Sequence, residues 1–256
     1  MSTQKSKVNI LSNMIKSSKK MMVLTGAGMS TASGLADFRS QGGLWEGKNP
    51  LEIASVKALQ PEPQETWAER QKEFTEFYRW RIQEVQKHKP NEGHDILTKW
   101  QKDGYINVMT TQNVDGYHQE SGMYSVYALH GNIREVRCNT CGYRYTEDHY
   151  LMARVPQCAC PDRGVLRPCI TLFGEDLDPK AYIAFKLASK CDFILVLGSS
   201  LKVSPANQLP YEVLSRGGRY AIINNDPTDQ DTMADLVIND DIIKTLKAVD
   251  EELYKL

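Results

Sequence analysis

The chain has 256 residues, of which 41% are hydrophobic and 25% charged, and its formal net charge is -1 at pH 7. This composition is typical of a soluble globular protein made of one large domain, or of a large domain with a small insert. The near-neutral charge gives no reason to expect binding to nucleic acid or to a membrane, and no apolar run is long enough to cross a bilayer.

The N-terminal segment and the cysteines together suggest a compartment. Met1–Lys5 leads into a polar, lysine-containing stretch that has none of the features of a secretory signal. Six cysteines in such a chain are expected to stay reduced, as metal ligands or core thiols. We therefore expect a cytoplasmic protein.

Helical and extended patterns alternate along most of the chain. Val8, Leu11 and Ile15 recur at helical spacing, so an amphipathic helix is expected first. Short apolar runs then predict buried strands at Met21–Leu24, Ile106–Met109, Phe193–Leu197, Tyr220–Ile223 and Leu236–Ile238. Helical patterns separate most of these strands, which favours an α/β fold: a Rossmann-like parallel sheet with helices on both faces.

Small and polar residues follow four of the predicted strands. They lie in Thr25–Ser30, Thr110–Asp115, Gly198–Ser200 and Asn224–Asp226. Ligands of open α/β sheets bind where the strands end, so four clusters in one chain predict a binding edge.

Two segments interrupt the alternation of strands and helices. Residues 42–94 are mostly helical, with a long pattern around Glu65–Lys87, and residues 132–168 are rich in Cys, Arg and Gly. We expect a Rossmann-like domain made of residues 1–41, 95–131 and 169–256. The first insertion would then be helical and the second a small zinc-ribbon-like module.

The turn Gly26-Ala27-Gly28 follows the first strand and precedes a predicted helix. Glycines there let backbone amides approach a pyrophosphate, and a helix N-terminus favours the anion. Thr31 stands where the dinucleotide-binding pattern has its third glycine, so the turn alone fits a tight strand-to-helix connection equally well.

The residues after this turn resemble the motifs of the sirtuin family, in order, over roughly residues 20–245. Gly26–Arg39 resembles GAGxS followed by SGIPDFR, and Thr111–His118 resembles TQNIDGLH. The remaining matches are Leu129-His130-Gly131, Phe173-Gly174-Glu175, Gly198–Leu201 with Val203, and Asn224 with Asp226. Two positions depart from the pattern: Leu35-Ala36 replaces Ile-Pro, which is expected to loosen the cofactor loop, and Tyr117 replaces a leucine.

The resemblance implies an NAD-dependent protein-lysine deacylase that acts on acyl-lysine proteins or peptides and yields nicotinamide and O-acyl-ADP-ribose. It implies that His130 is the general base, since a ribose hydroxyl must lose its proton and an imidazole of pKa ~6.5 suits that step. Two alternatives stay open: an ADP-ribosyltransferase or NAD hydrolase on the same fold, and a non-catalytic NAD-sensing module.

The resemblance also implies the residues that bind NAD. Asp115 would grip the nicotinamide carboxamide, Phe38 would shield the ribose and Arg39 would meet the phosphates. The full expected set is Gly26, Ala27, Gly28, Ser30, Thr31, Asp37, Phe38, Arg39, Gln112, Asn113, Val114, Asp115, His130, Gly198, Ser199, Ser200, Asn224, Asp226, Asp241 and Ile242. Asn91, Gly93 and His94 match a further motif, to which we assign the start of a helix.

The acyl-lysine peptide is expected to add as a strand between Phe173-Gly174-Glu175 and the stretch that includes Val203. Tyr78 and Arg81 share one face of the predicted helix, on a stripe with Phe74 and Val85. Tyr78-x-x-Arg81 resembles the pair that reads succinyl or malonyl groups in one sirtuin subclass. Equally open is a surface arginine that either pairs with a nearby glutamate, Glu73, Glu76 or Glu84, or snorkels to water.

Four cysteines have the spacing of a metal site. Cys138-x2-Cys141 is a usual knuckle, and Cys158-x-Cys160 is a tighter second pair. Four thiolates suit a closed, tetrahedral, structural zinc site. A metal-free remnant stays open, and Cys169 could replace one ligand although a strand should begin near it.

Overall fold

The computed structural model describes residues 2–37, 49–60 and 63–255. Its main sheet has six parallel strands in the order β3-β2-β1-β7-β8-β9. These strands are β1 Met21–Thr25, β2 Ile106–Thr111, β3 Val126–Ala128, β7 Phe193–Leu197, β8 Arg219–Ile223 and β9 Leu236–Ile238. The chain moves outward from β1 through β2 to β3 and later outward from β7 to β9. The order therefore reverses between β1 and β7, and this switch point is where ligands of such sheets bind.

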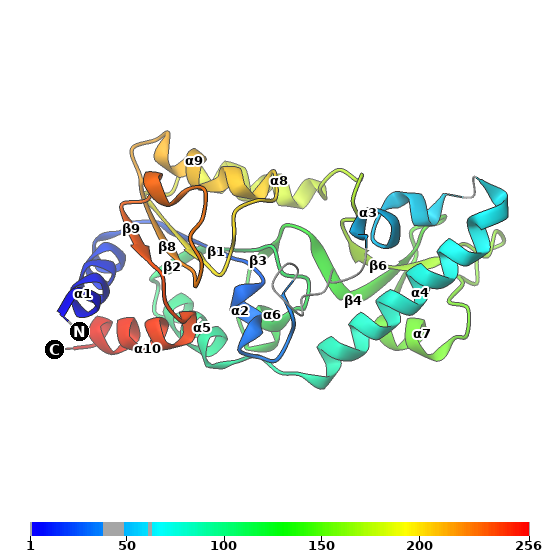
Figure 1. The fold of residues 1–256 in the computed structure, drawn as a ribbon, viewed down its shortest axis with the longest axis horizontal. Coiled ribbons are helices and arrows are strands. Elements are labelled where there is room, and N and C mark those ends of the chain that lie inside the picture. Colours follow the sequence, from blue (N-terminus) through cyan, green and yellow to red (C-terminus); the bar gives the residue numbers. More distant parts are fainter. Residues whose placement is uncertain (1, 38–48, 61–62, 256) are drawn as a thin grey trace.

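Both faces of the sheet are covered by helices, because the central strands are apolar on both sides (Figure 1). The side chains of Met21 and Val23 in β1 point to one face, and those of Met22 and Leu24 point to the other. The first face carries α1 Ser2–Ser17, α5 Glu92–Lys102 and α10 Ile242–Leu253, and the second carries α8 Pro179–Ala188 and α9 Leu209–Leu214.

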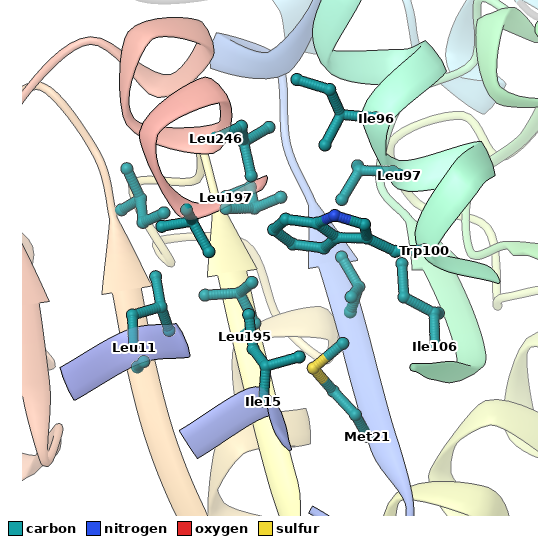
Figure 2. Close-up of a cluster of buried hydrophobic side chains, with 14 of the residues drawn as sticks. Leu11, Ile15, Met21, Ile96, Leu97, Trp100, Ile106, Leu195, Leu197 and Leu246 are labelled. Carbon is teal, nitrogen blue, oxygen red and sulfur yellow. The ribbon is translucent and has the colours of Figure 1, made fainter. Parts of the chain in front are cut away.

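Trp100 of α5 is the largest fully buried side chain on the first face. Figure 2 shows its indole lying against Leu195 and Leu197 of β7, with Leu246 of α10 beside them. Burial of an aromatic side chain of this size contributes on the order of 3 kcal/mol, so the α5–sheet contact is a main source of stability.

The other elements form a second lobe at the far end of the molecule from the termini (Figure 1). A three-stranded antiparallel sheet has the order β5-β4-β6, with β4 Gly131–Cys138, β5 Arg144–Thr146 and β6 Leu166–Ile170. Beside it lie α3 Pro50–Ile53, the long helix α4 Gln64–Lys87 and α7 Glu147–Met152. The two predicted insertions share one core, in which Ile82 of α4, Val136 of β4 and Tyr150 of α7 are buried.

The predicted parallel sheet, its five strands and the long helix are confirmed, with strand ends that differ by at most two residues. The helix start at Asn91–His94 is also confirmed, as a capping box in which the Asn91 N–H donates to His94 Nδ1.

The helix after the glycine turn is only the single turn α2 Gly28–Thr31, since the chain turns away at Gly34 with a φ of 93°. One turn also forms α6, Tyr117–Glu120. Within the described residues, no helix has both the length and the apolarity of a membrane span.

Candidate active site

A cavity of about 720 Å³ lies at the switch point, between the carboxyl ends of the strands and the second lobe. It brings together most of the residues that the sequence assigns to NAD. They are Gly26, Ala27, Gly28, Thr31, Asp37, Gln112, Asn113, Val114, His130, Gly198, Ser199, Ser200, Asn224, Asp226 and Ile242. All six expected substrate residues also line it: Tyr78, Arg81, Phe173, Gly174, Glu175 and Val203. The four polar clusters thus meet at one edge, as predicted.

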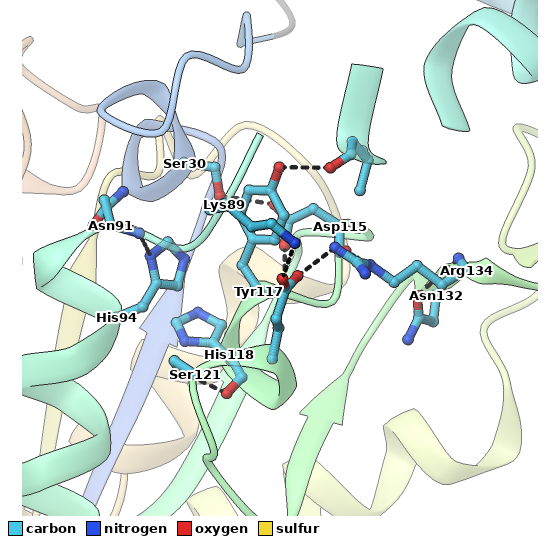
Figure 3. Close-up of polar contacts among 12 residues, drawn as sticks. Ser30, Lys89, Asn91, His94, Asp115, Tyr117, His118, Ser121, Asn132 and Arg134 are labelled. Carbon is cyan, nitrogen blue, oxygen red and sulfur yellow. Dashed lines mark hydrogen bonds and ion pairs between the residues drawn. The ribbon is translucent and has the colours of Figure 1, made fainter. Parts of the chain in front are cut away.

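Three expected NAD residues are not among those that line the cavity. Ser30 donates from Oγ to Asp115 Oδ2 at 2.7 Å, and Asp115 Oδ1 accepts from the Tyr117 N–H at 2.9 Å (Figure 3). Asn113 Nδ2 donates to the same serine Oγ at 3.1 Å, so these buried groups fix the loop that follows β2. Asp241 caps α10 by accepting from the Lys244 N–H at 2.7 Å. Phe38 and Arg39 lie outside the described residues.

The glycines of the first turn allow two strand ends to meet. The Gly28 N–H donates to the Gly198 carbonyl at 2.9 Å. A Cβ on Gly26 would lie 2.6 Å from that carbonyl oxygen, and a Cβ on Gly198 would lie 2.6 Å from the Met29 nitrogen. Because neither position tolerates a side chain, the turns after β1 and β7 form one continuous floor of backbone amides.

The ring of His130 is held by the chain itself. Its Nδ1 lies 3.0 Å from the Gln112 carbonyl oxygen, and a carbonyl only accepts, so Nδ1 is the protonated nitrogen of the neutral ring. Nε2 is then left with a lone pair on a residue that lines the cavity. Burial lowers the pKa of His130 below its usual value, against the smaller opposing effect of the Gln112 hydrogen bond. The ring is therefore a neutral proton acceptor at pH 7.

Tyr78 and Arg81 of α4 reach the cavity from the second lobe. Only 7% of Arg81 is exposed, so this arginine does not lie on the surface. Burial lowers the pKa of Arg81, and the Asp115 carboxylate is the strongest opposing influence. Burial raises the pKa of Tyr78, so its hydroxyl stays protonated. The cavity is therefore lined on this side by one guanidinium cation and one protonated hydroxyl.

The peptide edge is more restricted than the sequence suggests. The Phe173 N–H donates to Ala54 O at 2.9 Å, and the Val56 N–H donates to Phe173 O at 3.0 Å, so this backbone is already paired. Glu175 accepts two hydrogen bonds from the buried Arg167, whose Nη2 lies 2.9 Å from Oε2. These contacts fix the loop, and Gly174 within it lines the cavity.

The four expected cysteine ligands converge in the second lobe. The Sγ atoms of Cys138, Cys141, Cys158 and Cys160 all lie within 4.8 Å of one another, and two of the separations are 4.0 and 3.6 Å. Tetrahedral zinc with Zn–S bonds of about 2.3 Å requires separations of about 3.8 Å, so the cluster fits zinc. Cys169 lies in β6 outside the cluster, and its alternative role as a ligand is wrong.

Comparisons with known proteins match this geometry. The model of the Sir2 family matches residues 26–205. The chain is 44% identical to the NAD-dependent protein deacetylase 1 of Geobacillus kaustophilus, across 96% of this chain and 98% of the relative. It is 36% identical to the NAD-dependent protein deacylase of Pyrococcus furiosus, with the same coverage. A solved Sir2 complex with a deacetylated p53 peptide and 3'-O-acetyl-ADP-ribose superposes with a TM-score of 0.86 at 32% identity, covering 96% of this chain and 98% of that one.

The chain belongs to the Sir2 family.

Sequence reasoning missed part of the wall of this Sir2 site. Apolar residues of the second lobe also line the cavity: Ala54, Phe77, Ile133, Ile170 and Leu172. No motif marks them, and the available signal was only the helical stripe on which Phe77 borders Tyr78. Of the two departures from the sirtuin pattern, Leu35 is buried in the second-lobe core, and Tyr117 is buried between that lobe and the sheet.

Proposed function

We propose that this chain is an NAD-dependent deacylase that removes acyl groups from protein lysines and yields nicotinamide and O-acyl-ADP-ribose. The observation that carries the proposal is the neutral imidazole of His130, which has a lone pair on Nε2 and lines the same cavity as the amide floor, Tyr78 and Arg81. We also propose that it acts in the cytoplasm, where four cysteine thiolates remain reduced.

The residues that line the cavity have separate roles in the proposed reaction. When bound, NAD would supply a ribose carbon that the acyl oxygen of the substrate can attack, with nicotinamide as the leaving group. Ala27, Ser199 and Ser200 line the cavity at the switch point, and their backbone N–H groups would bind the diphosphate. The N–H groups of Gly26, Gly28 and Gly198 already donate to backbone carbonyls. His130 would accept a proton on Nε2 from a ribose hydroxyl, which lets that oxygen attack the acyl carbon so that the lysine leaves as its amine. One water molecule then adds to the acyl carbon and completes O-acyl-ADP-ribose. The buried wall keeps competing water away.

The acyl side of the pocket supports substrates that carry a carboxylate as well as acetyl-lysine. Arg81 is a buried cation that lines the cavity, and Tyr78 offers a protonated hydroxyl one turn away. A succinyl or malonyl carboxylate would pair with both groups, whereas an acetyl group would use only the apolar wall. Acetyl-, succinyl- and unmodified lysine peptides of one sequence, assayed side by side, decide this.

The test of the function is His130→Ala with an acylated peptide and NAD. We expect NAD binding to be retained and O-acyl-ADP-ribose to be lost by about 100-fold or more, since a general base contributes on that order. Mass spectrometry measures the product and calorimetry measures the binding. The control is His149→Ala, which removes an exposed histidine of the second lobe.

Three results would contradict the proposal. Near-normal turnover by His130→Ala would remove the base from the mechanism. Nicotinamide without the acylated product would indicate an NAD hydrolase or ADP-ribosyltransferase, and NAD binding without turnover would indicate a sensor.

A further inference from the structure

Tyr117 connects the loop that follows β2 to helix α4, which carries Tyr78 and Arg81. Its ring is fully buried, and its hydroxyl donates to the Val85 carbonyl oxygen at 2.9 Å, across 32 positions of the sequence (Figure 3). Its backbone N–H donates to Asp115 Oδ1 at 2.9 Å. Tyr117 thus bonds both to the Asp115 carboxylate, in the loop that follows β2, and to the backbone of α4 at Val85.

The Val85 carbonyl is one that the helix itself leaves without a partner. Helix α4 ends at Lys87, and the backbone is extended at His88, so the amide that would normally bond to Val85 O lies beyond the helix end. The tyrosine hydroxyl takes this place. A leucine, which the quoted sirtuin pattern has here, carries no donor and could not make this contact.

The position of Val85 decides where Arg81 points. The two residues are four apart, one turn of the helix, and share the buried stripe with Tyr78 and Phe74. Because a helix turn is rigid, a fixed carbonyl at Val85 fixes the rotation and height of the turn that carries Arg81.

The other side of Tyr117 is held as firmly. The Arg134 guanidinium lies 5.7 Å from the centre of the tyrosine ring, and its Nε donates to the Asp115 carbonyl oxygen at 2.8 Å. Glu120 binds the same guanidinium and also pairs with Lys89, just past the end of α4, at 3.0 Å (Figure 3). The ring therefore has little freedom, and its hydroxyl is a fixed point for α4.

We propose that Tyr117 is a specificity-determining positioning residue, whose hydroxyl holds the last turn of α4 so that Arg81 meets a carboxylate on the acyl group. The inference rests on the proposed deacylase function and deepens it. It assigns to Tyr117 no contact with the substrate, so its effect appears through Arg81 alone.

The test is Tyr117→Phe, which removes the hydroxyl and keeps the ring. We expect kcat/KM for a succinyl-lysine peptide to fall about five- to tenfold, through a raised KM, because one buried hydrogen bond is lost. With the acetyl-lysine peptide of the same sequence, kcat/KM should change less than about twofold, and the KM for NAD should be unchanged. A structural weakening would lower both peptides alike, so an unchanged succinyl-to-acetyl ratio overturns the proposal.

Two further measurements keep the test independent of activity. The control Tyr220→Phe removes another fully buried hydroxyl, in β8, which has no hydrogen-bond partner among the described residues and should leave the ratio unchanged. A crystal structure of Tyr117→Phe should show Arg81 displaced, and Arg81 in its original place overturns the proposal whatever the kinetics. If the wild type forms no O-acyl-ADP-ribose, the proposed function fails, and the displacement of Arg81 still decides the role of Tyr117.

Discussion

Gly198 shows how far a single side-chain atom can matter at this site. Its φ is 62°, and a Cβ there would lie 2.6 Å from the Met29 nitrogen, against the backbone of the first turn. Gly217 has a similar φ of 77°, but among the described residues nothing lies within 4 Å of its added Cβ. Alanine at Gly217 would therefore cost stability only through the left-handed backbone, whereas alanine at Gly198 would add a steric clash.

We predict that Gly198→Ala lowers the free energy of unfolding by about 3 kcal/mol or more, because left-handed strain and overpacking add. Gly217→Ala should cost only the conformational part, about 1 kcal/mol. Urea unfolding of both variants measures the difference. Equal losses would mean that the two turns can move apart without cost, and the proposed amide floor would then lack a fixed geometry.

At the residue scale, the sequence predicted which side chains gather but not what each one does there. The two motifs that contain Ser30 and Asp115 were recognised, yet the two side chains bond to each other and do not line the cavity. Glu175 was expected at the peptide edge, and its carboxylate is held by Arg167. Spacing identifies the element that carries a residue. The hydrogen-bond partner comes from a distant segment, and one sequence holds no signal for that pairing.

At the scale of elements, α4 and the cysteine module were predicted separately, but they pack as one body. Tyr150 of α7, in the cysteine module, is buried in the same core as Phe74 and Ile82 of α4. The cysteine cluster closes the loops at the end of this module, between Cys138 at the end of β4 and Cys158. Metal binding there should therefore stabilise the wall that carries Arg81, although the cysteines do not line the cavity.

We predict one zinc ion per chain, lost in Cys160→Ser and kept in Cys169→Ser. Removing one of four ligands opens the site and exposes the loops that it closes, so the melting temperature of Cys160→Ser should fall by about 5–10 °C. Cys169→Ser is the matched control because this thiol lies in β6, outside the cluster. Metal analysis and thermal unfolding of the purified proteins measure both effects. Full zinc content in Cys160→Ser would contradict the ligand set.

At the scale of the whole molecule, alternating patterns were enough to predict a parallel sheet with helices on both faces. The strand order was not predicted, because it depends on the side of the growing sheet on which each connecting helix places the next strand. The reversal between β1 and β7 places Gly26 beside Gly198, 172 residues further along. This long-range pairing turns separate polar clusters into one site.

The same burial that forms the core makes the stability of the protein depend on pH. His94 and His118 are at most 1% exposed, and burial lowers the pKa of each below its usual value. Asp115 and Asp95 oppose this at His94, while the neighbouring His94 adds to it at His118. His118 Nε2 lies 2.8 Å from Thr25 Oγ1, and within the described residues its Nδ1 has no partner, so a proton there would place an unpaired charge in the core.

We predict that the protein loses stability as the pH falls from 7 to 5. Between the lowered pKa of the folded state and the unfolded value of about 6.5, the unfolded chain binds a proton that the folded chain does not. The stability is therefore fully present above that unfolded value, and each such histidine removes up to about 1.4 kcal/mol per pH unit below it. Carboxylates with lowered pKa, such as those of Glu175 and Asp192, lose their contribution only at lower pH, so this window isolates the histidines.

Urea unfolding at several pH values measures how steeply the free energy of unfolding changes with pH. This slope should be flatter for His118→Gln than for the wild type, whatever the absolute stability of the variant. His149→Gln, which replaces an exposed ring, should keep the wild-type slope. Parallel curves for His118→Gln and the wild type would show that the buried imidazole is not the source of the acid sensitivity.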